Sequence, residues 1–374
     1  MANLVVQEVS TRRQQREFVD FASALYADDP HWTPPLRANQ KGLLGFAPHP
    51  FYERNEGQAF LAYRGGEVCG RVLAILNRGH IERYDDRRGF FGFFECVDDT
   101  DVAKALFEAV RGWFADRDVY ALRGPTNPSL NYELGLLIEG FHEPATFMMT
   151  YNPPYYERLI EACGFHKAQD LYAYWGHVDM LPKIHARLNP ITEQIIEHYN
   201  VRVRPLDRAR FLEEVSTFLD IYNRSLVNTW GFVPMSPAEI EHMARGLRYL
   251  IVPELALAAE IDGRMVGAVF GLPDFNPRIK QIRGRLLPFG FIRLLWNKRK
   301  IKRIRLISTN VLPEYQRMGV GLVLMGGLVP ATIAWGIQEA EFSWVLESNS
   351  LSRGSLEKGG AKRTKTYRLY DFEP

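Results

Sequence analysis

The sequence predicts an α/β protein of mixed α+β type. We expect two tandem domains, each with a mixed, mostly antiparallel sheet flanked by helices. The length of the chain, the alternation of strand-like with helix-like segments and an internal repeat predict this. The 374 residues are 46% hydrophobic and 24% charged, as in ordinary globular proteins, and they suffice for two domains. Strands that alternate with helices favour a sheet that is covered on both faces.

Two hairpins of similar pattern open the repeat. Segment 60–75 has an apolar alternation around Gly65-Gly66, and segment 257–272 has one around Asp262-Gly263. Both dipeptides tolerate the positive φ angles of a two-residue hairpin turn. The same interval along the chain separates Gly66 from Gly263 and Asn152 from Asn349, so the halves match in order.

The flanks of the hairpins also correspond. Helical segments at 11–29 and 207–225 precede them, and each copy ends in a short helix and a strand with tyrosines. We interpret the halves as copies of one domain, with two unrelated α/β domains as the alternative. The first domain is expected at 1–178, a linker with a helix at 179–200, and the second domain at 201–374.

Composition argues against several classes of protein. The cysteines Cys69, Cys96 and Cys163 are far apart, and the nine histidines show no metal-ligand spacing, so we expect no disulfide scaffold and no metal. The N-terminus lacks the pattern of a signal peptide, and we expect a cytoplasmic protein.

The most informative motif is 311-VLPEYQRMGVGLVLMGGL-328, where a strand-like run meets a long uncharged segment. A helix N-terminus offers unpaired N–H groups to an anion, and Gly319 and Gly321 let the backbone approach it closely. Arg317 adds a fork that pairs with phosphate, and Gln316 adds an amide donor. The motif predicts a phosphate or pyrophosphate site, with a simple tight turn as the alternative.

The order around this loop resembles the GNAT superfamily of acyl-CoA-dependent N-acyltransferases. The strand, the loop QRMGVG, the apolar helix, a strand at 341–349, a short helix at 352–360 and a last strand all match, over about 170 residues. The family's loop pattern is Gln/Arg-x-x-Gly-x-Gly/Ala. The resemblance implies that the backbone from Gln316 through Met318 and Val320 to Gly321 holds the pyrophosphate of coenzyme A.

Further residues follow from the same resemblance. It implies that Asn310 and Val311 pair through their backbone with the pantetheine arm of the acyl-CoA co-substrate. Asn349 and Ser352 match the family's Asn-x-x-Ser, near the pantetheine and at the cap of the next helix. The first copy departs from the pattern, because Asp98, Asp99 and Asp101 precede its helix and repel a pyrophosphate. We expect it to be degenerate, with a structural or acceptor-binding role.

The resemblance implies direct attack of an amine on the thioester, which needs a base for the amine proton and an acid for the thiolate. We name Glu347, Asn349 and Tyr367 as candidate catalytic residues, and Glu95 and Glu133 are the other carboxylates considered for the base. The family often has a tyrosine acid in Leu-Tyr-Glu-Lys, which is absent from the matching segment 355–358, Ser-Leu-Glu-Lys. Water or Tyr367 would have to replace it.

Segment 278–305 carries eleven of the 46 Lys and Arg residues, and the chain has no acidic residue between Asp274 and Glu314. Leucine, phenylalanine and tryptophan are interleaved with these cations, a pattern that favours peripheral contact with an anionic membrane, at its inner face. Nucleic acid is the less favoured partner. A solvated basic face, or a rim that attracts the phosphates of coenzyme A, is the structural alternative.

A narrower resemblance concerns the acceptor. The runs RRGFFGFFEC, RGPTNPSLNYELGLLIEGF and MMTYNPPYYERLIEACGF resemble a branch of tandem GNAT proteins that includes bacterial ceramide synthases. This branch implies transfer of a long acyl chain to a sphingoid amine. Acetylation of a small amine and a catalytically silent acyl-CoA-binding or lipid-surface module are the alternatives. The sequence leaves open the acyl length, the acceptor, the base and the oligomeric state.

Overall fold

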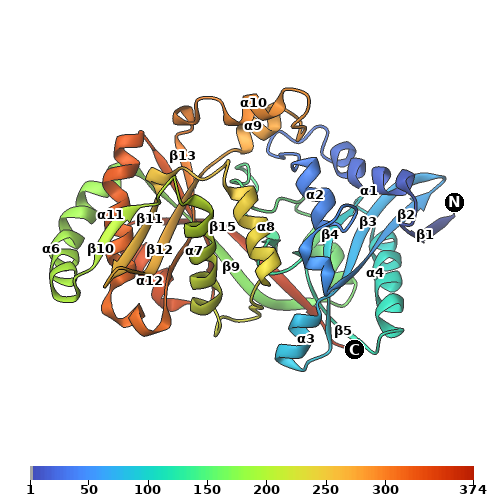
Figure 1. Cartoon of the computed structure of the whole chain (residues 1–374). Helices are drawn as coiled ribbons and strands as arrows, with labels where there is room; N and C mark the ends of the chain where they lie inside the picture. Colours follow the sequence, from blue (N-terminus) through green and yellow to red (C-terminus); the bar gives the residue numbers. More distant parts are fainter. Residues whose placement is uncertain (1–2) are drawn as a thin grey trace. The chain divides into compact units, whose positions relative to one another are not determined.

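The computed structural model describes residues 3–374, which form two compact units (Figure 1). The first unit combines Met1–Leu171 with Asn276–Leu294 and Lys365–Pro374, and the second combines Tyr172–Phe275 with Leu295–Thr364. Strands β9 (His166–His177) and β15 (Lys362–Phe372) therefore have residues in both units. Each unit is completed by chain from the other half of the sequence. The expected domain boundary around 179–200 remains a prediction.

The first unit is a mixed sheet with helices. Strands β1 to β4 pair antiparallel in sequence order, β5 pairs parallel with β4, and β15 pairs antiparallel with β5 and β8. Its strands are β1 (Leu4–Glu8), β2 (Glu56–Arg64), β3 (Glu67–Leu76), β4 (Arg88–Cys96), β5 (Ala121–Gly124), β6 (Thr126–Asn127), β7 (Glu133–Leu134) and β8 (Leu136–Glu139). Its helices are α1 (Arg12–Leu25), α2 (Arg37–Leu43), α3 (Arg78–Tyr84), α4 (Thr100–Ala115), α5 (Tyr156–Ala162) and α9 (Asn276–Gln281).

The second unit repeats this plan. Strands β10 to β13 pair antiparallel in sequence order, and β14 pairs parallel with β13. Its strands are β10 (Arg202–Pro205), β11 (Ala256–Ile261), β12 (Arg264–Pro273), β13 (Arg303–Val311) and β14 (Glu339–Leu346). Its helices are α6 (Leu181–Tyr199), α7 (Phe211–Ser225), α8 (Pro237–Leu247), α11 (Val320–Trp335) and α12 (Ser350–Lys358). Helix α10 (Gly290–Leu295) has all but its last residue in the first unit.

The two predicted hairpins are confirmed, and they correspond in detail. Gly65 and Gly66 have φ angles of 61° and 88°, and Asp262 and Gly263 have 52° and 74°. The β2–β3 register shifts between Ala62 and Tyr63, and the β11–β12 register shifts at the corresponding residues of the second copy, between Ala259 and Glu260. A shared bulge at one position is a feature of a common fold. The edge strands β1 and β10 were not predicted, because they are short and only partly buried.

Each sheet buries its apolar face under one long helix. In the first unit, Leu106, Phe107 and Val110 of α4 pack into a core with Phe91 of β4. In the second, Val323, Leu324 and Leu328 of α11 pack on β11 to β13. The uncharged segment that begins at Met318 thus covers a sheet. Among residues 3–374, no helix combines the length and the apolar character that crossing a membrane requires.

A largely buried ion pair of Arg71 with Glu95 joins β3 to β4 in the first unit. Glu95 accepts hydrogen bonds from the hydroxyls of Tyr26 and Tyr156, both at 2.7 Å, and its other oxygen lies 3.3 Å from Nη2 of the buried Arg71. Burial raises the pKa of the Glu95 carboxyl, whereas Arg71 and the two hydroxyls lower it. These contacts give Glu95 a structural role, because its removal would leave Arg71 buried without this partner.

We predict that Glu95→Ala lowers the free energy of unfolding by about 3–5 kcal/mol, because it leaves an uncompensated buried charge. The control is Glu82→Ala, which breaks the exposed ion pair with Arg54 and should cost about 0–1 kcal/mol. Urea denaturation of both variants measures the difference. Equal stabilities of the two variants would contradict the structural role of Glu95.

Candidate acyl-CoA site

The site is built where two parallel strands part. Pairing between β13 and β14 runs from Arg303↔Glu339 to Leu306↔Phe342 and then ends, although β13 continues to Val311 and β14 to Leu346. On its other edge β13 remains paired with β12 as far as Val311. Backbone groups between Ser308 and Val311 therefore face a fork between the strands. An extended ligand can add to such an edge through main-chain hydrogen bonds.

A buried ionic network forms the base of this fork. Nε of Arg305 donates to the hydroxyl of Ser343 at 2.9 Å, and this hydroxyl donates to Oε1 of Glu341, also at 2.9 Å. Arg305 is 1% exposed and Glu341 is fully buried. Since a buried guanidinium is tolerated only with such partners, the network fixes the point at which the strands separate.

The predicted phosphate loop lies at the end of β13. A 3-10 turn, Pro313–Met318, leads into α11, and Gly319 at the junction has a φ of 76°. The Gln316 amide donates to the carbonyl of Val311 at 3.1 Å, which ties the loop back to the strand, and Arg317 is exposed. No side chain caps α11 at Gly319, so its first N–H groups point out of the helix with partial positive charge.

Helix α6 holds this loop from one side. A Cβ on Gly319 would lie 2.6 Å from Cδ1 of Ile195, and one on Gly326 would lie 3.4 Å from Cγ2 of Thr192. Glycine is therefore required at 319 both by its φ angle and by the close packing of α6. The sequence predicts only a linker helix here, and no local signal marks Ile195 as a support of the loop.

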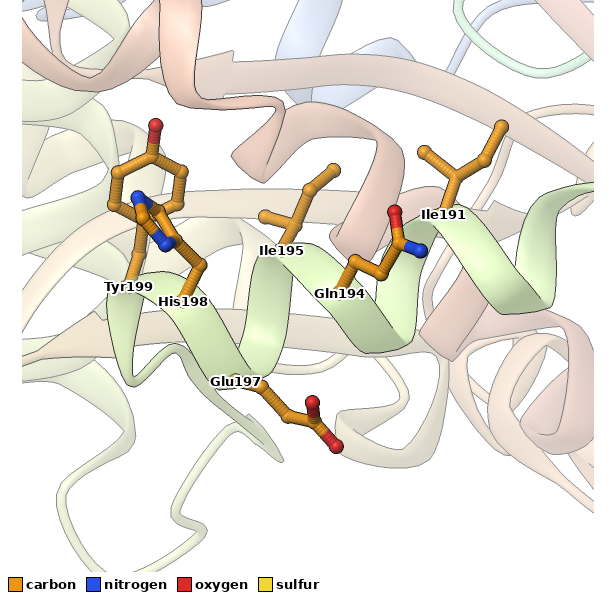
Figure 2. A pocket seen from close by; sticks show the side chains of 6 residues that line it. All are labelled: Ile191, Gln194, Ile195, Glu197, His198 and Tyr199. Carbon is orange, nitrogen blue, oxygen red and sulfur yellow. The ribbon is translucent and has the colours of Figure 1, made fainter.

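An open hollow of about 620 Å³ follows the same helix, and Figure 2 shows the side chains that line it. They are Ile191, Gln194, Ile195, Glu197, His198 and Tyr199. Ile195 belongs both to this hollow and to the contact with Gly319. The hollow thus lies next to the loop, and it offers an amide and an imidazole beside apolar surface.

The predicted residues Asn310 and Val311 sit at the end of β13. Asn310 is buried, its side-chain oxygen accepts a hydrogen bond from the Ser225 hydroxyl of α7 at 2.9 Å, and its amide donates to Ser308. Val311 packs into the core under α11. The Asn310 side chain is thus held on the α7 face, which leaves its backbone at the fork. Ser225 was missed by sequence analysis, because its contact with Asn310 is long-range.

Glu347, Asn349 and Ser352 lie together where β14 leads into α12. The side chain of Asn349 caps α12 by accepting from the Ser352 N–H at 3.0 Å. Glu347 accepts a hydrogen bond at 3.3 Å from the hydroxyl of Tyr172, and its carbonyl accepts one from Arg353 at 2.7 Å. Three of the predicted residues therefore lie together just after β14, the strand that forms one side of the fork.

Tyr367 belongs to the first unit. It lies on β15, is fully buried, and pairs through the backbone with Leu137 of β8. A Cβ on Gly135 would lie 3.0 Å from the Cβ of Tyr367. Its packing is that of a core residue, and its role in the reaction remains a prediction.

The first copy differs at the helix that corresponds to α11. Asp99 caps α4 by accepting from the N–H groups of Asp101 and Val102, and it forms an ion pair with Arg64 at 2.6 Å. The hydrogen bond from Arg64 is the main reason why the pKa of the Asp99 carboxyl is lowered. The Asp99 carboxylate therefore caps the N-terminus of α4, where a bound anion would otherwise lie, and the sequence predicted this cap.

The fork of the first copy is also filled. Its β4–β5 pairing ends at Phe90↔Arg123, and beyond this point the side-chain oxygen of Asn127 accepts from the Phe93 N–H at 2.7 Å. The carbonyl oxygen of Thr126 lies 1.7 Å from where a Cβ on Gly92 would be. Since Gly70 pairs with Cys96 as Gly267 pairs with Val311, Phe93 corresponds to Ser308. The chain itself thus fills the fork of the first copy with Thr126 and Asn127.

Comparison with known proteins agrees with this geometry. No family model matches the chain. It is 34% identical to Protein YghO of Escherichia coli (strain K12), over 98% of this chain and 95% of the relative. It is also 34% identical to a protein of Caulobacter vibrioides named bacterial ceramide synthase, over 99% and 97% of the two chains.

Solved structures show the same fold at low sequence identity. A tandem GNAT protein from the clavulanic acid biosynthesis pathway aligns with a TM-score of 0.57 at 11% identity, over 99% of this chain and 98% of its own. A GCN5-related N-acetyltransferase from Sphaerobacter thermophilus aligns with a TM-score of 0.53 at 13% identity, over 98% and 95%. The chain thus has the tandem GNAT fold and belongs to the family of the bacterial ceramide synthase and YghO.

Proposed function

We propose that this protein transfers a long acyl chain from a coenzyme A thioester to a lipid amine, and that the fork between β13 and β14 is the site of transfer. The observation that carries the proposal is the contrast between the two copies. Asp99 caps the helix of the first, whereas Gly319 leaves α11 without a side-chain cap at the end of the fork. In this proposal the backbone from Gln316 to Gly321 binds the pyrophosphate, and Arg317 pairs with it.

The chemistry follows from the groups around the fork. The amine attacks the thioester carbonyl, and N–H groups of the strand from Ser308 to Val311 stabilise the negative charge that develops on its oxygen. Glu347 accepts the proton that the nitrogen releases. Asn349 and Ser352 order the turn that carries Glu347, because the asparagine side chain caps α12.

The acceptor class rests on two supports. The relative from Caulobacter, 34% identical over almost the whole chain, is named a bacterial ceramide synthase. In addition, the basic segment 278–305, called the cationic segment below, exposes apolar side chains that suit contact with lipid. Acetyl transfer to a small amine and a silent acyl-CoA-binding module are the competing functions that the first measurement below distinguishes.

We further propose peripheral contact with an anionic membrane through the cationic segment. Leu287 is 79% and Phe289 is 72% exposed, and Phe291 and Ile292 next to them are exposed as well. Arg283, Arg285 and Arg293 lie in the same stretch. The segment is fixed to its unit, since the N–H of Arg37 donates to the carbonyl of Gly284 at 3.0 Å and Asn276 donates to that of Ala145 at 2.7 Å. Exposed apolar side chains within a cationic stretch are what anionic lipid attracts.

Binding of acyl-CoA at the loop can be tested by thermal unfolding. Palmitoyl-CoA at a hundred times its Kd should stabilise the native protein by about 2.7 kcal/mol, and Gly321→Glu should abolish this effect by placing a carboxylate at the pyrophosphate. A Cβ at 321 meets only ordinary contacts of 3.9 Å or more, so the variant should fold, and Gly321→Ala is the matched control. Thermal unfolding with palmitoyl-CoA and with acetyl-CoA measures the effect.

The outcomes separate the candidate functions. A larger shift with palmitoyl-CoA than with acetyl-CoA supports a long-chain donor, and the reverse order supports acetylation. Stabilisation without release of coenzyme A in the presence of sphinganine or a small amine would support the silent module. A folded protein that neither thioester stabilises would contradict acyl-CoA binding.

Contact with the membrane can also be tested. The double variant Leu287→Ser/Phe289→Ser should lower the partition coefficient onto phosphatidylserine-containing vesicles about tenfold or more, because it removes two apolar side chains from the interface. Ile333→Ser is the matched control, since Ile333 is an exposed apolar residue of α11 far from this segment in the chain. Vesicle co-sedimentation at low and high salt measures binding. Equal binding of wild type and the double variant would overturn the proposed contact.

A further inference from the structure

A strand with two tyrosines lies beside β14, which forms one side of the fork, and the sequence did not reveal it. Within the second unit, β9 lies beside β14, on the edge away from β13. Tyr172 and Tyr174 of β9 form a buried cluster with Val345 of β14, and Leu356 of α12 packs against this cluster. Leu356 stands where the GNAT pattern has its tyrosine. Strand β9 thus places two phenol groups next to Leu356, where α12 has no tyrosine of its own.

Tyr172 is the member of this cluster that reaches the proposed base. Its hydroxyl donates to Oε1 of Glu347 at 3.3 Å. The guanidinium groups of Arg363 and Arg353 lie 4.7 Å and 5.7 Å from the centre of its ring. Arg353 is itself fixed by its bond to the Glu347 carbonyl. Two cations beside a phenol stabilise negative charge that develops on it during proton transfer.

We infer that Tyr172 is the general acid of the reaction, supplied by the strand that ends the first half of the chain. The inference rests on the proposed function. When the amine nitrogen bonds to the carbonyl carbon and the carbon–sulfur bond breaks, the Tyr172 hydroxyl gives its proton to the thiolate. Glu347 takes the proton that the nitrogen loses. Glu347 then returns this proton to the Tyr172 phenolate along their hydrogen bond, so both residues regain their starting state.

Tyr174 provides a matched comparison on the same strand. Its hydroxyl donates to Oε1 of Glu357 at 2.8 Å, and burial raises its pKa to about 12. Glu357 lies in the last turn of α12, at the opposite end of that helix from Asn349. Tyr174 therefore shares the strand, the cluster and a carboxylate partner with Tyr172, but its partner is not the proposed base.

The test measures release of coenzyme A from palmitoyl-CoA, with sphinganine as acceptor, in the full chain. Tyr172→Phe should lower kcat by about 10²–10⁴-fold, the usual contribution of a general acid, with little change in KM or in stabilisation by palmitoyl-CoA. Tyr174→Phe should keep a kcat near that of the wild type. The double variant Tyr172→Phe/Leu356→Tyr returns a phenol to the cluster from α12 and should recover at least about tenfold of the lost rate.

The results show whether Tyr172 acts as the general acid. A wild-type kcat in Tyr172→Phe, an equal loss in Tyr174→Phe, or loss of palmitoyl-CoA stabilisation together with kcat would overturn the role of Tyr172 as acid. A wild-type protein that binds no acyl-CoA would instead refute the proposed function. If the wild type binds palmitoyl-CoA but acylates no amine, single-turnover hydrolysis of the bound thioester replaces the assay, because protonation of the thiolate is common to both reactions.

Discussion

The separation of β13 from β14 is the constraint on which the proposed chemistry depends. Two parallel strands that are joined as far as Leu306↔Phe342 leave an unpaired edge on β13 beyond that point. Unpaired backbone groups are costly unless they find partners, and here they lie at an edge that a bound substrate can complete. The buried Arg305, Ser343 and Glu341 network holds the base of the fork in place.

The two copies show how one fold can keep or lose a site through few residues. Both have the same strand order, the same bulge and a long helix after the fourth strand of the antiparallel run. In the first, Asp99 and Asn127 satisfy the helix terminus and the Phe93 N–H from within the chain. In the second, Gly319 leaves the helix terminus without a side-chain cap, and the β13–β14 pairing ends at Leu306↔Phe342. The two copies thus differ around the fork in hydrogen bonding and not in architecture.

The first half of the chain still contributes to the second unit. Residues of β9 beyond Leu171 belong to that unit, and they carry Tyr172 to Glu347. The last residues of β15 complete the first unit, where Arg123 forms a bidentate pair with Asp371, both bonds at 2.7 Å. Because each unit needs a strand from the other half, neither half of the sequence contains all of a unit.

Local features were determined by the sequence alone. Such features are the hairpin turns at Gly65-Gly66 and Asp262-Gly263, the carboxylate cap at Asp99 and the glycine at the start of α11. They depend on the φ preferences and hydrogen bonds of adjacent residues, so a short stretch of sequence predicts them. Only the tertiary structure decided where β13 and β14 part, that α6 packs on Gly319, and that Tyr172 meets Glu347. These contacts join residues that are far apart in the chain, and they depend on strand order and packing, for which single residues carry no local signal.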